Sequence, residues 1–408
     1  MLLSNNFSNI SKMKTKLKSL IILLLAFSTI LSAKNYKEIR WLKTAIDRSQ
    51  EQLLAASENY KSGKLNPRSF ENGKLYFANY KDWTCGFFPG SLWYMYELTN
   101  NEKFKKEAEF YTEILDQVQY RKDTHDLGFM LYCSYGNGFR LTGNENYKKV
   151  LVTGSNSLMT RFHPEVGLIK SWDGRKDWQY PVIIDNMLNL EMLCEVSKLT
   201  GEVMYKKASV SHANKTLENH FRPDNSCFHV INYDSINGKV ISRVTHQGFS
   251  NSSAWARGQG WAIYGFTMMY RETRDPKYLD QARKVAAFLL NNPNLPADKV
   301  PYWDFNAPNI PDAPRDASAG ALYASALIEL SGFVKNGKEY LDAAEKILIS
   351  LSSFSYLAEK GENGLFILKH STGNLPAKKE IDVPLNYADY YFIEALSRYM
   401  KAKNINIH

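Results

Sequence analysis

Two kinds of helical pattern alternate along this chain. In the first kind, apolar residues recur at intervals of three or four and leave a polar stripe, as in residues 278–289 and 340–351. In the second kind nearly every position is apolar, as in residues 127–141 and 186–199. A helix with one apolar stripe lies on the surface of a fold, whereas a helix that is apolar all round is enclosed by others. The alternation therefore predicts pairs of outer and inner helices.

A recurring turn separates two helices of different kind. Its signature is a threonine at the end of one helix and an aromatic residue five positions later. The copies are Thr99 with Phe104, Thr142 with Tyr147, Thr200 with Tyr205, and Thr273 with Tyr278. Such turns are typical of helical hairpins.

Counting both kinds of pattern predicts about twelve helices. They are expected at residues 36–60, 84–99, 103–120, 126–142, 146–161, 185–199, 203–220, 255–272, 276–292, 316–334, 338–354 and 387–403. Six inner and six outer helices make an all-α fold, a closed (α/α)6 barrel, with an open superhelical array as the alternative. Residues 222–250 contain two short apolar runs that predict a small β-hairpin between helices.

The N-terminal residues have the pattern of a secretory signal peptide. Lysines at positions 12, 14, 16 and 18 precede an apolar run at residues 20–31, which ends in Ser32 and Ala33. We therefore expect a signal peptide at residues 1–33, a periplasmic or secreted protein, and a single barrel domain at residues 34–408. The apolar run is shorter than the roughly 20 residues that span a membrane, so no membrane anchor is expected.

The charge and the cysteines exclude several classes of function. The formal net charge is +9, but the lysines and arginines are spread along the whole chain. This spread indicates a solvated surface with a mild preference for acidic ligands, and not a nucleic-acid interface. The four cysteines, at positions 85, 133, 194 and 227, include no CxxC pair, so no zinc site is expected. Buried free thiols are their expected state.

The unusual residues of the chain gather at the starts of the predicted inner helices. In a barrel of helical hairpins the longer connections lead into the inner helices, so the starts of those helices converge at one mouth. The segments concerned are Trp83 to Gly90, His125 and Asp126, Asp185, Trp255 to Trp261, Arg315 and Asp316, and Asn386 to Asp389. Their carboxylates, aromatic rings and cations predict a pocket at that mouth.

Asp185 has the most unusual setting among these residues. It follows three apolar residues at 182–184 and precedes Met187 and Leu188. An apolar environment raises the pKa of a carboxyl group and suits it to donate a proton. Asp126 is the natural second carboxylate. For either aspartate the alternative is an ordinary helix N-cap, which stabilises a helix by about 1 kcal/mol and has no chemical role.

Tryptophans near the same helix starts indicate a carbohydrate site, because sugar rings stack on such faces. Those on or near the predicted mouth are Trp83, Trp172, Trp178, Trp255, Trp261 and Trp303. Burial in the core is the alternative for each ring. Arg257 and Trp261 are four residues apart and share one helix face. A cation beside an aromatic ring at a helix start suits a sugar carboxylate.

Taken in order, these motifs resemble those of the unsaturated glucuronyl hydrolases, family 88 of the glycoside hydrolases. The resemblance spans residues 36–403. The matching segments are WTCGFFPGSLW at 83–93, HDLGF at 125–129, IDNMLNL at 184–190, THQGF at 245–249, SAWARGQGWAIYG at 253–265, RDASA at 315–319 and DYY at 389–391. Each segment alone is a weak signal, whereas seven in order are a strong one.

The resemblance implies hydration of a double bond in place of direct attack on the glycosidic bond. An acid protonates C4 of a terminal 4,5-unsaturated uronate, water adds at C5, and the resulting hemiketal opens and releases the rest of the chain. By motif match, Asp185 is that acid and then the base that activates water, and Asp126 lies beside it. The positions matching residues around the sugar are Trp83, His125, His229, Gln247, Arg257 and Trp261. No metal ion or organic cofactor is implied.

Two other functions stay open at this point. An unsaturated rhamnogalacturonyl hydrolase resembles this family in fold and chemistry, although the segments at 184–187 and 255–261 are closer to the glucuronyl type. A non-catalytic glycan-binding barrel would keep Asp185 only as a helix cap, and the presence of both Asp126 and Asp185 speaks against it. The expected partner is an unsaturated acidic oligosaccharide, with no nucleic-acid or membrane partner. Fragments of chondroitin, hyaluronan, heparin, gellan or ulvan fit equally, and a monomer is the default expectation.

Overall fold

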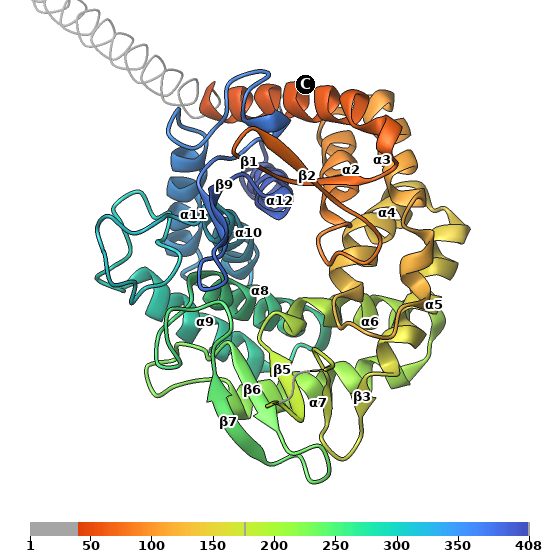
Figure 1. Cartoon of the computed structure of the whole chain (residues 1–408), viewed down its shortest axis with the longest axis vertical. Helices are drawn as coiled ribbons and strands as arrows, with labels where there is room; N and C mark the ends of the chain where they lie inside the picture. Colours follow the sequence, from red (N-terminus) through yellow and green to blue (C-terminus); the bar gives the residue numbers. More distant parts are fainter. Residues whose placement is uncertain (1–39, 175–176, 407–408) are drawn as a thin grey trace, which may run out of the picture.

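Two concentric layers of helices make up the protein (Figure 1). The computed structural model describes residues 40–174 and 177–406, so the predicted signal peptide at residues 1–33 lies outside the described residues. The inner helices are α2 (Phe87–Thr99), η3 (Gly128–Gly136) continued by α4 (Asn137–Thr142), α6 (Asn186–Thr200), α8 (Ala256–Thr273), α10 (Ala317–Ser331) and α12 (Asn386–Lys403). The outer helices are residues 40–59, α3 (Glu102–Glu113), α5 (Glu145–Met159), α7 (Val203–Asn219), α9 (Pro276–Leu290) and α11 (Lys338–Leu351).

The inner helices form a closed ring. Each contacts the next one along the chain, and α12 contacts α2. The prediction of an (α/α)6 barrel is confirmed, and the open array is excluded. Burial follows the two sequence patterns, because α9 buries a single stripe from Tyr278 to Leu289, whereas α10 buries almost every residue. The hydrophobic effect thus sorts the helices into layers.

The fourth helix differs from the prediction of one α-helix at residues 126–142. Its first part, Gly128–Gly136, is a π-helix, and only Asn137–Thr142 is α-helical. A side chain at Gly128 would place its Cβ 2.5 Å from the Cα of Asn189, so only glycine permits this approach to α6. The side-chain Oδ1 of Asn189 also accepts a 2.9 Å hydrogen bond from the Phe129 N–H. These contacts fix the position of the residues that precede the helix, including Asp126.

Short antiparallel strands lie in the connections between helices. The predicted hairpin within residues 222–250 is present as β6 (Val230–Tyr233) and β7 (Val240–Val244), and β5 (Tyr180–Ile183) pairs with β6 to make a three-stranded sheet. Hairpins that the sequence analysis did not predict are β1 (Asn66–Glu71) with β2 (Lys74–Ala78), β3 (Phe162–His163) with β4 (Leu168–Ile169), and β8 (Ser371–Asn374) with β9 (Lys379–Val383).

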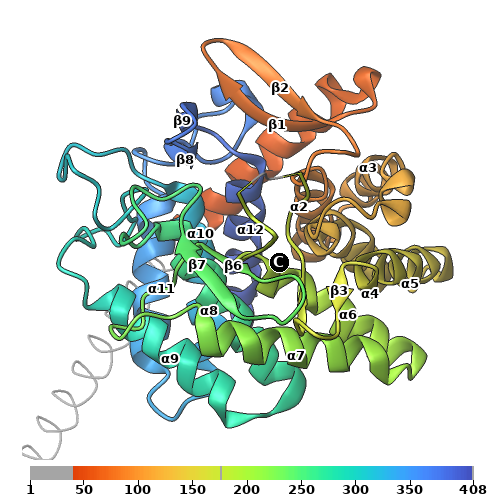
Figure 2. The ribbon, with the colours of Figure 1, turned by 60° about the horizontal axis from the view of Figure 1, so that its bottom comes forward.

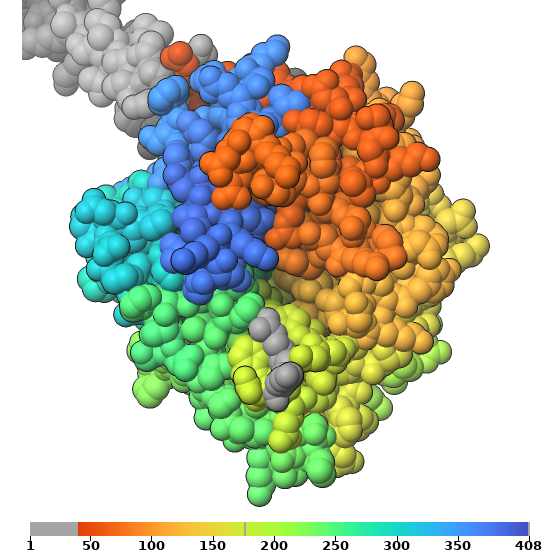
Figure 3. Space-filling view, in the orientation of Figure 1, coloured from red at the N-terminus to blue at the C-terminus, as the bar shows by residue number. Residues whose placement is uncertain are grey.

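The hairpins of the two chain ends meet at one end of the barrel. Strands β1, β2, β8 and β9 project from the same end (Figure 2), and β1 contacts β9. In the space-filling view, the N-terminal and C-terminal parts of the chain lie side by side above a hollow in the centre of this face (Figure 3). All four cysteines are buried and free, as expected from the sequence.

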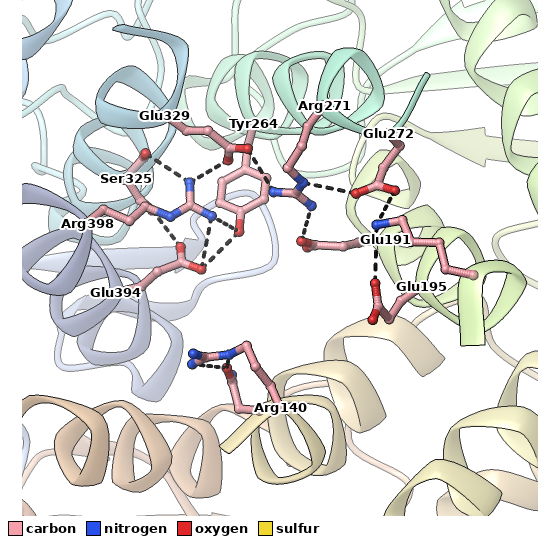
Figure 4. Close-up of polar contacts among 12 residues, drawn as sticks. Arg140, Glu191, Glu195, Tyr264, Arg271, Glu272, Ser325, Glu329, Glu394 and Arg398 are labelled. Carbon is pink, nitrogen blue, oxygen red and sulfur yellow. Dashed lines mark hydrogen bonds and ion pairs between the residues drawn. The ribbon is translucent and has the colours of Figure 1, made fainter. Parts of the chain in front are cut away.

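The opposite end of the barrel is closed by charged side chains. Residues from α6, α8, α10 and α12 form a network of hydrogen bonds and ion pairs there, and Arg140 of α4 forms a separate pair with Glu97 of α2 (Figure 4). Arg271 pairs with Glu191 at 2.5 Å and with Glu329 at 2.7 Å. Arg398 pairs with Glu329 at 2.7 Å and donates to the Tyr264 hydroxyl at 2.8 Å. The network lines a cavity of about 290 Å³ and ties neighbouring inner helices together.

Glu394 is the acceptor on which this network converges, and its replacement by glutamine should destabilise the barrel. It is 2% exposed and accepts hydrogen bonds from the hydroxyls of Tyr94, Tyr264 and Ser325. Glutamine removes the charge that faces Arg398 and leaves several donors with a single oxygen to share. We therefore expect the free energy of unfolding, measured with urea, to fall by about 2–4 kcal/mol. As a control, Glu97→Gln loses pairs with the exposed Arg140 and Lys401 and should cost less than about 1 kcal/mol. Equal losses for both variants would contradict this interpretation.

Candidate active site

Asp185 lies at the start of α6 but does not cap the helix. Its backbone is helical, and its side chain accepts no capping hydrogen bond. Asp316, by contrast, caps α10 through Ser318 N–H at 3.1 Å. The Asp185 side chain is buried, with the residue 7% exposed, and its Oδ2 has no hydrogen-bond partner within the described residues. The cap alternative therefore does not explain why an aspartate stands here.

The surroundings of Asp185 favour its neutral form. Burial raises the pKa of Asp185 to about 7, the guanidinium of Arg257 opposes the rise, and the negative charge of Asp126 adds to it. The buried indole N–H of Trp261 faces Asp185 as a weak hydrogen-bond donor and also favours its charged form, although the contact falls short of ordinary hydrogen-bond geometry. Near neutral pH the carboxyl group is therefore poised between donating and accepting a proton.

The three-stranded sheet brings His229 to Asp185. Strand β5 ends just before Ile184, and the Ile184 N–H donates to the carbonyl of His229, which precedes β6. The Nδ1 of His229 accepts hydrogen bonds from the backbone N–H groups of His246 and Gln247, both at 3.1 Å. Because burial also lowers the pKa of His229 well below its usual value, the ring is neutral and carries its proton on Nε2. That nitrogen lies 3.8 Å from Asp185 Oδ2, and its N–H points into the site without a hydrogen-bond partner in the part of the chain that the structure describes.

The second carboxylate, Asp126, is held by its neighbours along the chain. The Thr124 hydroxyl donates to Asp126 Oδ2 at 2.7 Å, and His125 Nε2 lies 3.2 Å from Asp126 Oδ1. The Ser171 hydroxyl lies 3.3 Å from His125 Nδ1 while its oxygen accepts from the Ile183 N–H. A hydroxyl that donates to Nδ1 places the imidazole proton on Nε2, toward Asp126. His125 is fully buried, and its Nε2 makes no hydrogen bond of ordinary geometry within the described residues, so the Thr124 hydroxyl is the group that holds Asp126.

Arg257 is enclosed by protein acceptors. Its guanidinium pairs with Asp316 at 2.7 Å and donates to the carbonyls of Thr372 and Gly373, each at 2.7 Å. Both charged side chains are no more than 1% exposed. The Gly373 carbonyl also accepts from Gln247 Nε2 at 3.0 Å. Arg257 and Gln247 therefore anchor the β8–β9 hairpin at the site, and the predicted contact of Arg257 with a sugar carboxylate remains a prediction.

The six tryptophans expected at the mouth divide into two groups. Trp255, Trp261 and Trp303 are at most 3% exposed, so the core alternative describes them. Trp261 packs against Phe129, 5.2 Å between ring centroids, and the half-buried Trp83 packs against the same ring at 5.6 Å. Trp261 thus forms part of the wall that encloses Asp185, and its burial leaves no face open for stacking.

Trp172 and Trp178 belong to the second group, which stays half-buried. Their rings stack on each other at 5.8 Å with an angle of 21°, and Trp172 contacts His246 and His229 edge to face. Both tryptophans were expected near the mouth but were not predicted as binding residues. Neither lies in one of the matched motifs, so only their aromatic character could have identified them.

The Arg257–Asp316 pair and the Thr372–Gly373 carbonyls were not predicted as parts of the site. Asp316 lies far from Arg257 in sequence, and no spacing rule links two residues on different inner helices. Among residues 40–174 and 177–406, no three His, Cys, Asp or Glu side chains are placed to hold a metal ion. In the same ranges no helix has the length and apolar character needed to cross a membrane.

Comparisons with known proteins agree with this architecture. An unsaturated glucuronyl hydrolase of Formosa agariphila is 51% identical over 345 residues, which cover 83% of this chain and 86% of the relative. An unsaturated chondroitin disaccharide hydrolase of Streptococcus agalactiae is 31% identical over 369 residues, covering 88% and 92% of the two chains.

Solved structures of similar proteins have the same fold. An unsaturated glucuronyl hydrolase described as specific for heparin superposes with a TM-score of 0.89 at 52% identity, covering 90% of this chain and 99% of the other. The unsaturated glucuronyl hydrolase of Bacillus sp. GL1 gives a TM-score of 0.81 at 28% identity, covering 88% and 96%. Residues 55–401 match the profile of glycosyl hydrolase family 88, and the chain therefore belongs to this family.

Proposed function

We propose that this protein removes the terminal 4,5-unsaturated uronate from oligosaccharides made by polysaccharide lyases, by hydrating the C4=C5 double bond. The observation that carries the proposal is Asp185, a buried carboxyl group with a pKa of about 7 and an oxygen that no described residue binds. Protonation of C4 requires a neutral acid beside that carbon. A carboxyl group that ionises near pH 4 would have lost its proton at neutral pH and could not act as this acid.

The reaction requires one group that first donates and then accepts a proton. Asp185 transfers its proton to C4, the electron pair of the double bond forms the new C4–H bond, and positive charge develops at C5 and the ring oxygen. Water adds at C5 and returns a proton to the Asp185 carboxylate. The C5 hemiketal then opens to a ketone, and the hemiacetal left at C1 releases the remaining chain as an alcohol. The aspartate ends in its starting state.

The neighbours of Asp185 support this cycle in different ways. The charge of Asp126 raises the pKa of Asp185, which keeps the acid loaded before the reaction. The Arg257 charge lowers that pKa and stabilises the carboxylate after proton transfer. The Nε2–H of His229 is placed to donate to an oxygen of the substrate or of the attacking water beside Asp185.

The substrate that we propose is a glycosaminoglycan fragment. The relatives named above act on glucuronyl or chondroitin substrates, and one neighbour in structure is described as specific for heparin. We further propose that the chain is exported through a signal peptide at residues 1–33, works as a monomer in the periplasm or outside the cell, and needs no metal ion or cofactor. The lysines and the apolar run at the N-terminus support export.

Loss of the ultraviolet absorbance of the conjugated double bond tests the function. Unsaturated disaccharides prepared with lyases from heparin, chondroitin, hyaluronan and ulvan would be mixed with the protein, sulfated and unsulfated forms side by side. We expect absorbance to fall for at least one glycosaminoglycan disaccharide. An unsaturated rhamnogalacturonan disaccharide in the same panel tests the first alternative. Binding without any loss of absorbance would instead establish the non-catalytic glycan-binding alternative and contradict the proposal.

A further inference from the structure

The hydrogen bonds that set the proton position of His229 come from one loop, residues 245–253. The backbone N–H groups of His246 and Gln247 both donate to His229 Nδ1 at 3.1 Å. A backbone N–H cannot accept a hydrogen bond, so Nδ1 carries no proton while both bonds are in place. The Nε2–H beside Asp185 therefore depends on where the loop holds these two N–H groups.

Asp304 attaches this loop to the rest of the protein. Its Oδ2 accepts hydrogen bonds from the Phe249 N–H at 2.9 Å and from the Ser253 hydroxyl at 2.7 Å. Its Oδ1 accepts from the Asn306 N–H at 2.8 Å. Asp304 is 0% exposed, so its carboxylate lies out of reach of a bound sugar. Its contacts with the loop are those of a structural support and not of a group that touches substrate.

A tight turn joins the Asp304 contact to the two N–H groups on His229. The Gly248 N–H donates to the Thr245 hydroxyl at 2.8 Å, which closes a turn over residues 245–248. A Cβ at Gly248 would lie 2.7 Å from Thr245 Oγ1 and 3.1 Å from Asp304 Oδ2, so the turn packs directly against the carboxylate. His246 and Gln247 are the central residues of this turn. A shift at Asp304 therefore moves the N–H groups that bind the imidazole.

The segment around Asp304 also holds the other side of the His229 ring. The ring lies 4.4 Å from that of Trp255, with an angle of 32° between the planes. Trp255 pairs with Asp304 in an isolated antiparallel β-bridge, and the Ala256 N–H donates to the Trp303 carbonyl at 3.1 Å. The imidazole is thus held between the loop and the Trp255 ring, and both are attached to the segment that carries Asp304.

A carboxylate at position 304 meets a requirement that an amide cannot meet. All of its hydrogen-bond partners are donors, and they bind both of its oxygens. Burial raises the pKa of Asp304, whereas the bonds from Phe249, Asn306 and Ser253 lower it. An asparagine has one accepting oxygen, and its NH₂ group would face a donor. Asp304→Asn therefore loses either the contact to the loop or the contact to Asn306.

We propose that Asp304 is a positioning residue for the reaction at Asp185. Through the loop it keeps the N–H groups of His246 and Gln247 on His229 Nδ1, and so fixes the ring form whose Nε2–H donates beside Asp185. When the loop is released, the proton of His229 exchanges between the two nitrogens, and part of the molecules lose this donor. The kinetic consequence rests on the proposed function, whereas the form of the ring is a property of the protein alone.

Nitrogen-15 NMR of the eight histidines tests the link from Asp304 to His229. The His229 signals are assigned by their absence in His229→Ala. Near pH 7 the wild type should show a protonated Nε2 and an unprotonated Nδ1, because burial keeps the ring neutral. In Asp304→Asn the two nitrogen signals should move toward each other, since both ring forms become populated. Unchanged His229 signals in this variant, or a proton on Nδ1 in the wild type, overturn the inference.

The kinetics of a double variant test the link from His229 to the reaction. The kcat per folded molecule is measured on an unsaturated disaccharide for the wild type, both single variants and Asp304→Asn/His229→Ala. Loss of a positioned donor should lower kcat roughly a hundredfold in His229→Ala, and its partial loss roughly tenfold in Asp304→Asn. Because Asp304 acts through His229, the double variant should match His229→Ala within about twofold. A further fall of about tenfold in the double variant, the additive result, would contradict the inference.

Asp389→Asn is the matched control. This buried carboxyl group also accepts two backbone N–H groups, from Ile367 and Leu368, which lie outside the loop at 245–253. It should leave the His229 signals and kcat near those of the wild type, and equal changes in Asp389→Asn and Asp304→Asn would count against a specific role for Asp304. Should Asp304→Asn fail to fold, Ser253→Ala decides by the same two readouts, because it removes one bond to the carboxylate and leaves the carboxylate in place.

The two readouts also separate this inference from the proposed function. A wild type that consumes no unsaturated disaccharide contradicts the proposed function, and the NMR comparison still tests whether Asp304 sets the form of the His229 ring.

Discussion

Replacing Asp185 with asparagine is expected to lower kcat on an unsaturated disaccharide by roughly a thousandfold, because general acid–base catalysis contributes that much and asparagine has no proton to give. The amide is close in size to the carboxyl group, and about half of the wild-type groups are neutral near pH 7, so the fold should be unaffected. The rate of absorbance loss under substrate saturation measures the effect. If the variant kept more than a tenth of the wild-type kcat, Asp185 would not be the general acid of the reaction.

The same substitution should stabilise the protein at alkaline pH. In the folded chain the pKa of Asp185 is raised to about 7, above the roughly 3.9 of an unfolded aspartate. The folded state therefore binds the proton more tightly than the unfolded state. The stability that this proton contributes to the fold is fully present below about pH 4 and is lost as the pH rises through 7. Asparagine avoids burying the charge, so at pH 8 the variant should gain on the order of 2–4 kcal/mol over the wild type. Near pH 4 the two should unfold alike.

Asp389 provides a matched control for the activity of Asp185. Burial raises its pKa to about 7 as well, but its two oxygens accept the backbone N–H groups of Ile367 and Leu368, both at 2.9 Å. An asparagine at this position has one accepting oxygen in place of two, so Asp389→Asn should cost about 1–3 kcal/mol of stability. Its activity per folded molecule should stay near that of the wild type. A large loss of kcat in this variant would show that replacing any buried aspartate at a helix start lowers the activity, so the loss in Asp185→Asn would not identify Asp185 as the acid.

Replacing Arg257 with methionine is expected to destabilise the protein by about 3–5 kcal/mol, the cost of leaving a buried charge without its partner. Asp316 is fully buried and would lose the cation that pairs with it, while the Thr372 and Gly373 carbonyls would lose this donor. Urea unfolding measures the loss. The β8–β9 hairpin should also become more accessible to protease, because two of its carbonyls are held by this side chain.

The double variant Arg257→Met/Asp316→Asn separates the charge from the packing. The amide oxygen of the substituted side chain can still accept from Ser318 N–H at the start of α10, and neither member of the pair is left as an unpaired ion. We therefore expect the double variant to recover at least about 1 kcal/mol relative to Arg257→Met alone. A single variant that costs less than about 1 kcal/mol, or a double variant that is less stable than the single, would contradict the assigned pairing.

The barrel could be predicted from the sequence because the apolar pattern of each helix indicates how much of its surface is buried. A stripe such as that of α9 can bury only one face, and an apolar helix such as α10 must be surrounded. The π-helical turn at Gly128–Gly136 could not be predicted in this way, because it depends on contact with Asn189 of a different helix. The β1–β2 and β8–β9 hairpins were not predicted, because polar residues and irregular registers obscure the alternation of apolar and polar residues along their strands.

The candidate site shows the same division between local and long-range information. The apolar neighbours of Asp185 indicated a raised pKa, and the structure agrees in direction and cause. The pairing of Arg257 with Asp316 could not be predicted from the sequence, because the two residues come into contact only when α8 and α10 pack together. The proton position on His229 is likewise set by backbone N–H groups of a distant loop. Residue types thus suggested the chemistry, whereas partners and protonation states required the fold.

The pH dependence of kcat/KM, measured for the wild type and for Asp126→Asn, tests most directly whether Asp185 acts as a neutral acid. In the wild type, kcat/KM should fall tenfold per pH unit above about 7, because the proton donor is lost as Asp185 ionises. Removing the charge of Asp126 lowers the pKa of Asp185, so the falling limb should move to lower pH in the variant even if its maximum rate is small. A wild-type profile that stays flat to pH 9, or a limb that does not move in Asp126→Asn, would contradict the account.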